Sequence, residues 1–553
     1  MSARPGGTPA EVIIGVDVGT TAAKVSAFGI GTRWRYTAVR EYPLLRPRPG
    51  WEVQQPEVLV DAVLAALAET VANCGGGTVL ALALSSAMHG LIGLDEQQRP
   101  LTPLITWADS RAVGEAAELR GAGLARTLLE RSGTPVHSMA PLPKLIWFRR
   151  HEPELFRRVR HWVGLKDWVL LALTGTLGTE LSSASGTGLL DLSTDTWSAP
   201  SLELAGIDPS QLPPVLATTA ALELGAAIAG RVGLPTATPV VLGAGDGPLG
   251  NLGSGAIRPG VAGLSLGTSG AIRALAPRTH LDRAGGLFRY ALTRDDWVVG
   301  GAISNGGSVQ RWAGDVFGGN LPAGNVPAGN VPGRAAGAMG ADDAALLRLA
   351  AAVPAGSDGL VALPYLMAER APLWDPTLTG AFLGVRNQHT RGHFVRACIE
   401  GVALQLWTIL AQLEAVVPVT SLRATGGVFR SPLWSRVLTD VLDRPVTVTD
   451  GAEGSALGAA ALGLIGIGRA NSLQAALDLL RPDAGSDADP MLPDPAAVAT
   501  YRGVRTRIPQ LLGSYADVAA LFAGPTEPEP AGAAGSGAEP AAAAPLLGSN
   551  REP

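Results

Sequence analysis

One short segment near the start of the chain has the residue types that hold a phosphate group. Residues 17–21 (DVGTT) follow an apolar run, and Lys24 comes three residues later. Glycine lets the main chain approach a phosphate, successive N–H groups form an anion-binding concavity, and hydroxyls add donors. A carboxylate beside such a turn, here Asp17, can hold Mg²⁺ through its water shell. Taken alone, the segment is explained equally well as an ordinary hairpin turn.

A second glycine-rich turn repeats this pattern in the other half of the chain. Residues 264–266 form an apolar run, and residues 267–270 (GTSG) follow it. Two strand-to-Gly-Thr turns, one in each half, are what a nucleotide held between two related domains requires. A third turn, at residues 426–427, has no side chains and leaves room for a flat purine. By itself, the third turn is more often a simple strand-to-helix connection.

Asp246 lies between two glycines at the end of another apolar run, in the segment VVLGAGDG of residues 240–247. Phosphoryl transfer depends mainly on positioning and charge neutralisation, with a carboxylate accepting the proton of the attacking hydroxyl. Asp246 is a candidate for that base, because it falls between the two Gly-Thr turns. A lone Asp in a glycine-flanked turn is more often a turn former, so the assignment depends on neighbouring motifs.

The elements that must position these residues alternate between strands and helices. Apolar runs predict strands over residues 12–18 and 24–28, joined by a hairpin at the GTT turn. A helix is predicted from Pro56, with apolar residues at helical spacing, and a strand follows over residues 78–86. Further strands are expected near residues 239–243, 263–266, 421–425 and 445–449, with a helix over residues 432–442. This alternation favours layered α/β domains.

The composition indicates small-molecule chemistry in at least two domains. A chain of 553 residues is too long for one hydrophobic core. Its net charge of -5 provides no basic face for nucleic acid or anionic lipid. The P-loop motif GxxxxGK[ST] is absent, which argues against that class of nucleotide-binding protein.

Targeting signals and cysteine usage favour a cytoplasmic protein. The two cysteines, Cys74 and Cys398, lie outside any disulfide or zinc pattern. No signal peptide precedes the first predicted strand. The uncharged residues 78–94 are too few and too polar to span a membrane, so we expect a buried strand and loop there.

Two longer segments carry a resemblance to a known family. The first is MAPLPKLIW at residues 139–147, and the second is GGVFRSPLWSRVLTDVLDRPV from residue 426, followed by EGSALG at residues 453–458. Together with the glycine turns and Asp246, they resemble the FGGY carbohydrate kinases over roughly residues 12–510. The resemblance implies an α/β fold of two ribonuclease H-like (actin-like ATPase) domains with an interdomain cleft.

The same resemblance implies a domain order. A sugar-binding N-terminal domain is expected over residues 12–255 and an ATP-binding C-terminal domain over residues 256–515, with residues 1–11 as an extension. Residues 319–333 contain a PAGN repeat with too little apolar side chain to pack, which predicts a flexible insertion. The Pro- and Ala-rich residues 524–553 predict a disordered tail.

The resemblance also implies a role for each candidate residue. Asp246 is expected to be the catalytic base and, with Asp17, to hold Mg²⁺. The expected ATP contacts are Gly19, Thr20, Thr21, Lys24, Gly267, Thr268, Ser269, Gly426 and Gly427. The expected substrate contacts are Met88, His89, Asp109, Arg111, Asp246 and Gly247.

The segments around the expected sugar site are most similar to those of gluconokinases. These segments are SSAMHG, TWADSRA, GTPVHSMAP and LPYLMAERAPLWD, and the Arg-Glu pair typical of glycerol kinases is absent. The expected reaction is therefore ATP-dependent phosphorylation of D-gluconate to 6-phospho-D-gluconate. Gluconate requires an anion-pairing donor, and the sequence leaves Arg111, His137, His89 and Lys144 open for that role.

Several alternatives stay open at the level of sequence. A xylulokinase or other pentulose kinase would belong to the same family. The actin-like fold also serves filament-forming and chaperone ATPases, although the sugar-loop residues and residues 139–147 argue against that class. A silent sugar sensor would not need Asp17, Asp246 and both Gly-Thr turns. The expected partner is a small sugar or sugar acid, with no nucleic acid and no membrane, and a homodimer is left open.

Overall fold

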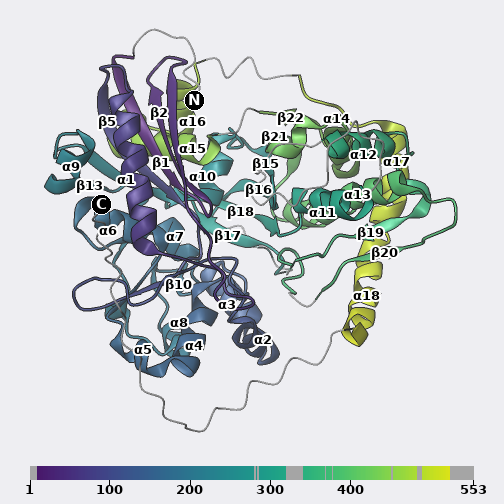
Figure 1. The fold of residues 1–553 in the computed structure, drawn as a ribbon, viewed down its shortest axis with the longest axis horizontal. Helices are drawn as coiled ribbons and strands as arrows, with labels where there is room; N and C mark the ends of the chain where they lie inside the picture. The colour runs from purple at the N-terminus through teal and green to yellow at the C-terminus, as the bar shows by residue number, and fades with distance from the viewer. Residues whose placement is uncertain are drawn as a thin grey trace, which may run out of the picture.

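The computed structural model describes residues 9–278, 282, 285–318, 341–367, 369–375, 378–449, 453–482 and 489–522. Two six-stranded sheets dominate it and lie side by side (Figure 1). The first sheet has the order β13-β14-β5-β1-β2-β3 and comprises β1 (Glu11–Val18), β2 (Ala22–Gly29), β3 (Arg35–Glu41), β5 (Thr78–Ser86), β13 (Ala221–Glu223) and β14 (Pro239–Gly245). The second has the order β17-β18-β16-β15-β21-β22 and comprises β15 (Gly260–Leu266), β16 (Gly270–Pro277), β17 (Phe288–Ala291), β18 (Asp296–Ile303), β21 (Val419–Thr425) and β22 (Val446–Val448).

The two sheets repeat one plan. In each, a three-stranded antiparallel meander continues into two parallel strands, which are β3-β2-β1-β5-β14 in the first sheet and β18-β16-β15-β21-β22 in the second. The β1–β2 turn and the β15–β16 turn therefore occupy equivalent places in the two sheets. These are the two Gly-Thr turns, so the repeated motif follows from a repeated structure.

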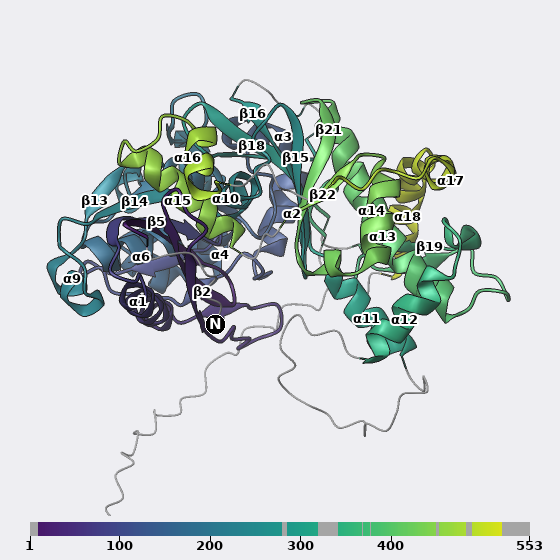
Figure 2. The same cartoon turned by 90° about the horizontal axis from the view of Figure 1, so that it is seen from above.

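Helices cover the outer faces of the sheets and fill the space between them (Figure 2). The first sheet is covered by α1 (Pro56–Ala72), α6 (Leu165–Thr174) and α9 (Ala226–Val232), and the second by α13 (Arg391–Glu414) and α14 (Pro432–Leu442). The middle layer contains α10 (Asp246–Gly253), α15 (Gly454–Gly466) and α16 (Leu473–Leu480). Helices α11 (Gly307–Phe317), α12 (Ala341–Ala351), α17 (Pro495–Arg505) and α18 (Ile508–Phe522) lie around α13 and α14.

A smaller group of helices lies beside the first sheet, below it in Figure 1. It comprises α2 (Val113–Gly121), α3 (Ala125–Ser132), α4 (Pro141–His151), α5 (Pro153–Arg158), α7 (Leu181–Ser185) and α8 (Ala199–Ala205). Its own core includes Leu145, Phe148 and Trp162. The start of α4 is the MAPLPKLIW segment, so that motif has a packing role in the described structure.

α10 and α15 approach each other closely because glycines line their contact. A Cβ at Gly458 would overlap the backbone carbonyl of Leu249, and one at Gly253 would overlap that of Gly454. α10 is rich in glycine and has low helix propensity, but Leu249 and Leu252 are fully buried in the middle layer. Tertiary packing therefore makes a helix of a segment whose sequence suggests a turn.

The α/β alternation predicted from the sequence is confirmed. The expected hairpin is β1–β2, the strand of residues 78–86 is β5, and the helix of residues 432–442 is α14. The uncharged residues 78–94 include β5, which is an internal strand of the first sheet. α13 is long and apolar enough to cross a membrane, but it is mostly buried, and a core helix passes the same test.

Some expectations fall outside what the structure describes. Residues 1–8 of the N-terminal extension, the insertion at residues 319–333 and the tail at residues 524–553 lie outside the described residues. The domain boundaries stay a prediction. α15, from the second half of the chain, packs on β1 and β5 of the first sheet, so the layers do not follow chain order strictly.

Candidate active site

Two cavities lie where the two sheets meet α10. The first, which we call the Lys24 cavity, has a volume of about 270 Å³ and is lined by Asp17, Lys24, Asp246, Gly247, Gly250, Asn251, Ser254, Gly263, Leu264, Ser265, Arg273, Arg423, Thr425, Glu453, Gly454, Ser455 and Ala456. The second, the His89 cavity, has a volume of about 230 Å³ and is lined by Thr20, Met88, His89, Trp107, Met139, Asp246, Gly247, Ser265, Ser269, Gly270, Arg273, Phe288, Tyr290, Ala302, Arg370 and Trp374. The cavities share a wall of Asp246, Gly247, Ser265 and Arg273. Groups bound on either side of this wall would meet at Asp246.

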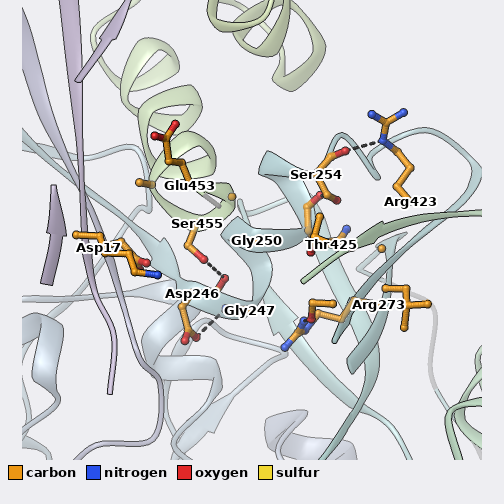
Figure 3. A pocket seen from close by; sticks show the side chains of 17 residues that line it. Asp17, Asp246, Gly247, Gly250, Ser254, Arg273, Arg423, Thr425, Glu453 and Ser455 are labelled. Carbon is orange, nitrogen blue, oxygen red and sulfur yellow. Dashed lines mark hydrogen bonds between the residues drawn. The ribbon is translucent and has the colours of Figure 1, made fainter. Parts of the chain in front are cut away.

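Asp246 is the first residue of α10, directly after β14, and stands between the two sheets (Figure 3). Its Oδ1 accepts a hydrogen bond of 2.7 Å from the backbone N–H of Gly247. Burial raises the pKa of Asp246 to about 6, and repulsion from Asp17 adds to the effect. At neutral pH the carboxylate is ionised and has an increased proton affinity, which suits a general base.

Asp17 provides the second carboxylate of the Lys24 cavity. On β1 it lies opposite Lys24 of β2 and Ser85 of β5. The Ser85 hydroxyl donates a 2.7 Å hydrogen bond to its Oδ1. Burial raises the pKa of Asp17, while Ser85 and Lys24 oppose that rise.

The Asp17–Asp246 pair has the donor chemistry that Mg²⁺ requires. Mg²⁺ in phosphoryl-transfer sites takes one or two carboxylates and completes its shell with water and phosphate oxygens. No group of three or more His, Cys, Asp or Glu side chains suited to a metal occurs in the described part of the chain. The pair therefore fits an ion shared with a phosphate, and a cation between the two carboxylates would relieve their repulsion.

The two Gly-Thr turns line the His89 cavity rather than the Lys24 cavity, although ATP contacts were expected from them. Thr20 and Ser269 line the His89 cavity, and Thr20 Oγ1 accepts a 2.9 Å hydrogen bond from Trp107 Nε1. Lys24 lines the Lys24 cavity. The other expected ATP contacts in these turns do not line either cavity; they are Gly19, Thr21, Gly267 and Thr268. Of these, Thr21, Gly267 and Thr268 are exposed.

The third glycine turn borders the Lys24 cavity. Gly426 and Gly427 are exposed and follow Thr425, which lines the cavity. Gly426 has a φ of 124°, and a Cβ there would overlap the backbone of Leu266. Only glycine allows β21 to end this close to the β15–β16 turn.

The opposite rim of the Lys24 cavity comes from the start of α15. The Ser455 hydroxyl donates to the backbone carbonyl of Asp246 at 3.2 Å (Figure 3). Glu453 accepts a 2.7 Å hydrogen bond from Thr37 of the first sheet. The EGSALG segment thus connects the shared wall to the first sheet.

His89 supplies a neutral hydrogen-bonding group to the second cavity. Its Nδ1 lies 2.7 Å from the Gly186 carbonyl, which identifies Nδ1 as the protonated nitrogen. Burial lowers the pKa of His89 to about 3. The remaining nitrogen, Nε2, accepts a long hydrogen bond of 3.4 Å from the Tyr290 hydroxyl, which a sugar hydroxyl in the cavity would have to replace. Met88, packed against Gly245, lines the same cavity.

Asp109 and Arg111 do not line either cavity. They form a buried bidentate pair, with both nitrogen–oxygen distances 2.8 Å. The Arg111 guanidinium also lies 3.7 Å from the centre of the Trp51 ring, and Asp109 accepts a 2.8 Å hydrogen bond from the Glu52 N–H. This geometry supports the loop that carries Trp107.

Two further candidates for pairing with an anion, Lys144 and His137, already form hydrogen bonds with backbone groups. Lys144 is fully buried, and its Nζ donates to the carbonyls of His89, Thr106 and Met139 at 2.9, 2.7 and 2.8 Å. Burial lowers the pKa of Lys144 to about 7. His137 Nδ1 accepts a hydrogen bond from the Met139 N–H at 3.1 Å. Of the four candidates, only His89 lines a cavity, and it is neutral.

Several cavity-lining residues were not identified from the sequence, among them Arg273, Tyr290, Arg370 and Trp374. Arg273 had a detectable signal, because it is a lone charged residue in the apolar strand AIRALA of residues 271–276. Arg370 and Trp374 belong to LPYLMAERAPLWD, which resembles family segments but does not indicate which side chains turn inward. Tyr290 is contributed by β17, an edge strand that periodicity did not reveal.

Solved structures of sugar kinases have this arrangement of sheets. Gluconate kinase from Lactobacillus acidophilus has a TM-score of 0.84 and 29% identity, with 93% of this chain and 99% of that chain covered. Xylulose kinase from Lactobacillus acidophilus has the same TM-score and identity, with 93% and 100% covered. The expected pair of actin-like, ribonuclease H-like domains is confirmed by this similarity.

Sequence comparison gives the family. The FGGY family of carbohydrate kinases matches through its N-terminal domain at residues 12–253 and its C-terminal domain at residues 262–467. Gluconokinase of Bacillus subtilis (strain 168) is 36% identical over 472 residues, which are 85% of this chain and 90% of that protein. The chain therefore belongs to the FGGY family of carbohydrate kinases, as the motifs predicted. This membership identifies it as a sugar kinase and not as an assembly ATPase.

Proposed function

We propose that this kinase transfers the γ-phosphoryl group of ATP to the terminal hydroxyl of D-gluconate, giving 6-phospho-D-gluconate and ADP. Asp246 accepts the hydroxyl proton as that oxygen forms its bond to phosphorus. The bond between the γ-phosphorus and the bridging oxygen breaks, and ADP retains the bridging oxygen. The observation that carries this proposal is the shared wall, because Asp246 faces both cavities.

The Lys24 cavity is the proposed donor side. Asp17 and Asp246 would hold Mg²⁺, which supplies neutralisation of phosphate charge when bound. Lys24 is placed to pair with a phosphate, while Gly19, Thr21, Gly267 and Thr268 offer backbone and hydroxyl donors at the approach. Gly426 and Gly427 would lie against the adenosine. We expect an enzyme with this donor to act in the cytoplasm.

The His89 cavity is the proposed acceptor side. Met88 and the aromatic rings of Trp107, Tyr290 and Trp374 give it an apolar wall. Nε2 of His89 accepts from a sugar hydroxyl, and the N–H of Gly247, held by the Asp246 carboxylate, keeps the base oriented. Bringing the two sheets together over this cavity would exclude water, which otherwise competes as an acceptor.

Gluconate is favoured as the acceptor by the relative from Bacillus subtilis and by the cationic side chains that face the cavity. The test is a panel of gluconate, xylulose, ribulose and glycerol with ATP, followed by release of ADP and by mass spectrometry of the product. We expect the highest kcat/KM for gluconate and a product with one added phosphate at the terminal carbon.

A xylulokinase is the second candidate, because the xylulose kinase structure is as similar as the gluconate kinase structure. Both sugars would use Asp246 in the same way. Saturation by xylulose at far lower concentration than by gluconate would replace our choice of substrate while leaving the donor side as proposed.

A further inference from the structure

We propose that Arg273 and Arg370 form the subsite that receives the carboxylate of a sugar acid in the His89 cavity. This inference rests on the proposed function, since it assigns the charged end of the acceptor. Both side chains line the cavity, and both follow β15, the first strand of the second sheet, in the chain. Neither was among the residues that sequence reasoning offered for this role.

One edge of the Arg370 guanidinium is hydrogen-bonded to the protein, and the other edge is available to a ligand. Its Nε donates to the Ser304 hydroxyl at 3.2 Å, and its Nη2 donates to the Ile303 carbonyl at 2.7 Å. The guanidinium also lies 4.8 Å from the centre of the Trp107 ring, which comes from the opposite half. Nη1 has no hydrogen-bond partner within the described residues.

Arg273 is anchored less completely. Its Nη1 donates to the Ser265 hydroxyl at 3.1 Å. Its Nε is buried and has no partner in the parts of the chain that the structure describes. A Cβ at position 247 would lie 3.2 Å from Nη2 of Arg273, so the absence of a side chain at Gly247 makes room for the guanidinium beside Asp246.

The charges that face the His89 cavity do not cancel. Among the described residues that line it, Asp246 is the only acidic one, His89 is neutral, and Arg273 and Arg370 are both cationic. Glu369, the neighbour of Arg370 in the chain, does not line the cavity. It is fully buried and accepts a hydrogen bond of 2.9 Å from Asn305. Burial lowers the pKa of Arg370 to about 10; the charge of Glu369 opposes that fall, repulsion from Arg273 adds to it, and Arg370 stays charged at neutral pH.

An anionic ligand group would remove this imbalance, whereas a neutral sugar would leave it. Guanidinium groups bind carboxylates through paired, charge-assisted hydrogen bonds, and each arginine retains unused N–H donors for them. A carboxylate between Arg273 and Arg370 would satisfy those donors and reduce the repulsion between the two cations. The acceptor would then be oriented by its charge at one end and by Asp246 at its reacting hydroxyl.

The test compares D-gluconate with D-glucitol, in which an uncharged CH₂OH replaces the carboxylate on the same six-carbon chain. Isothermal titration gives the ratio of their dissociation constants for the full chain and for R273Q, R370Q, R273K and R370K. We expect each Gln variant to lower the preference for gluconate by about 10- to 100-fold, the range of hydrogen bonds to a charged group. The Lys variants should keep part of the preference, because they retain the charge but lose the planar fork.

The control is R111Q, which removes a buried arginine that the sequence left open for this role together with His89, His137 and Lys144. It should reduce thermal stability, because Asp109 loses its partner, yet leave the gluconate-to-glucitol ratio unchanged. General damage to the site would weaken the binding of gluconate and glucitol equally and leave the ratio of their dissociation constants unchanged. An unchanged ratio in R273Q and R370Q would therefore overturn the subsite. If the wild-type protein phosphorylates xylulose and not gluconate, the proposed function fails; if it phosphorylates gluconate but the ratio is insensitive to both arginines, only the subsite fails.

Discussion

Asp246 shows how the folded environment changes the chemistry of a single carboxylate. In an unfolded chain it would be a weak base, with a pKa near 3.9. Removal from water at the start of α10, together with the charge of Asp17, raises that pKa to about 6. The same change makes the residue more effective at taking a proton at neutral pH.

Replacing Asp246 by Asn tests its role as the base. The variant keeps the shape of the side chain but cannot accept the hydroxyl proton, so kcat should fall by about 10²- to 10⁴-fold. Binding of an ATP analogue with Mg²⁺ should weaken far less, which calorimetry can measure. Turnover close to that of the wild-type protein would rule out Asp246 as the base.

The raised pKa of Asp246 also predicts the pH dependence of the reaction. The active form is the ionised carboxylate, so kcat/KM should be nearly constant above pH 7 and decline by about tenfold per pH unit well below pH 6. The measurement is a kcat/KM profile from pH 5 to pH 8 with saturating ATP. The residual activity of D246N should lack this acid limb, and an acid limb that persists in D246N would assign it to another group.

At the residue scale, the sequence was sufficient to predict that certain motif residues would line the cavities. Asp17, Asp246, Met88 and His89 line the cavities because their turns are fixed by strands. Arg111 was a reasonable candidate for the carboxylate, but a nearby acid in the chain, Asp109, is its partner. Such pairing depends on side-chain rotamers, which a one-dimensional motif does not specify.

At the scale of elements, the strands were predictable because their apolar runs have clear ends, whereas α10 was not. Its glycines lower helix propensity, and only its place between two sheets stabilises it. The contacts that matter there join residues far apart in sequence, such as Leu249 and Gly458. Local periodicity cannot reveal them.

Introducing a methyl group into the α10–α15 contact should destabilise the protein and misplace the base. In G458A the new Cβ meets the Leu249 backbone, so we expect a loss of about 1–3 kcal/mol in the free energy of unfolding and a lower kcat. Gly230 is the matched control, because it is helical and exposed, with open space around it. G230A should be neutral or stabilising by up to about 1 kcal/mol. Equal stabilities for G458A and G230A in chemical denaturation would refute the close contact.

At the scale of the whole molecule, the repeated sheet plan explains why both halves supply the site. Equivalent hairpins, β1–β2 and β15–β16, approach a common centre from opposite sides. The sequence predicted the two α/β halves from their paired motifs. It did not predict that α15 returns to the first sheet, since a helix carries no local mark of the sheet on which it packs.

Ligands that touch both halves should bind cooperatively. The first ligand brings the sheets together over the shared wall, so the second should bind more tightly, with a coupling free energy of about 1–3 kcal/mol. The measurement is gluconate affinity with and without a non-hydrolysable ATP analogue and Mg²⁺. The radius of gyration from small-angle scattering should decrease when both are present. Independent binding with no change in size would contradict closure of the cleft.

The shared wall also limits how this enzyme can be given a new acceptor. Met88, His89 and Arg370 line the His89 cavity and not the Lys24 cavity, so they can be exchanged for residues that suit another sugar while the donor side keeps its lining. Arg273 lines both cavities. A change at Arg273 alters the surroundings of the transferred phosphoryl group together with those of the sugar. A new substrate specificity introduced through Arg273 will therefore require a compensating change elsewhere. A design that begins at Arg370 will not require one.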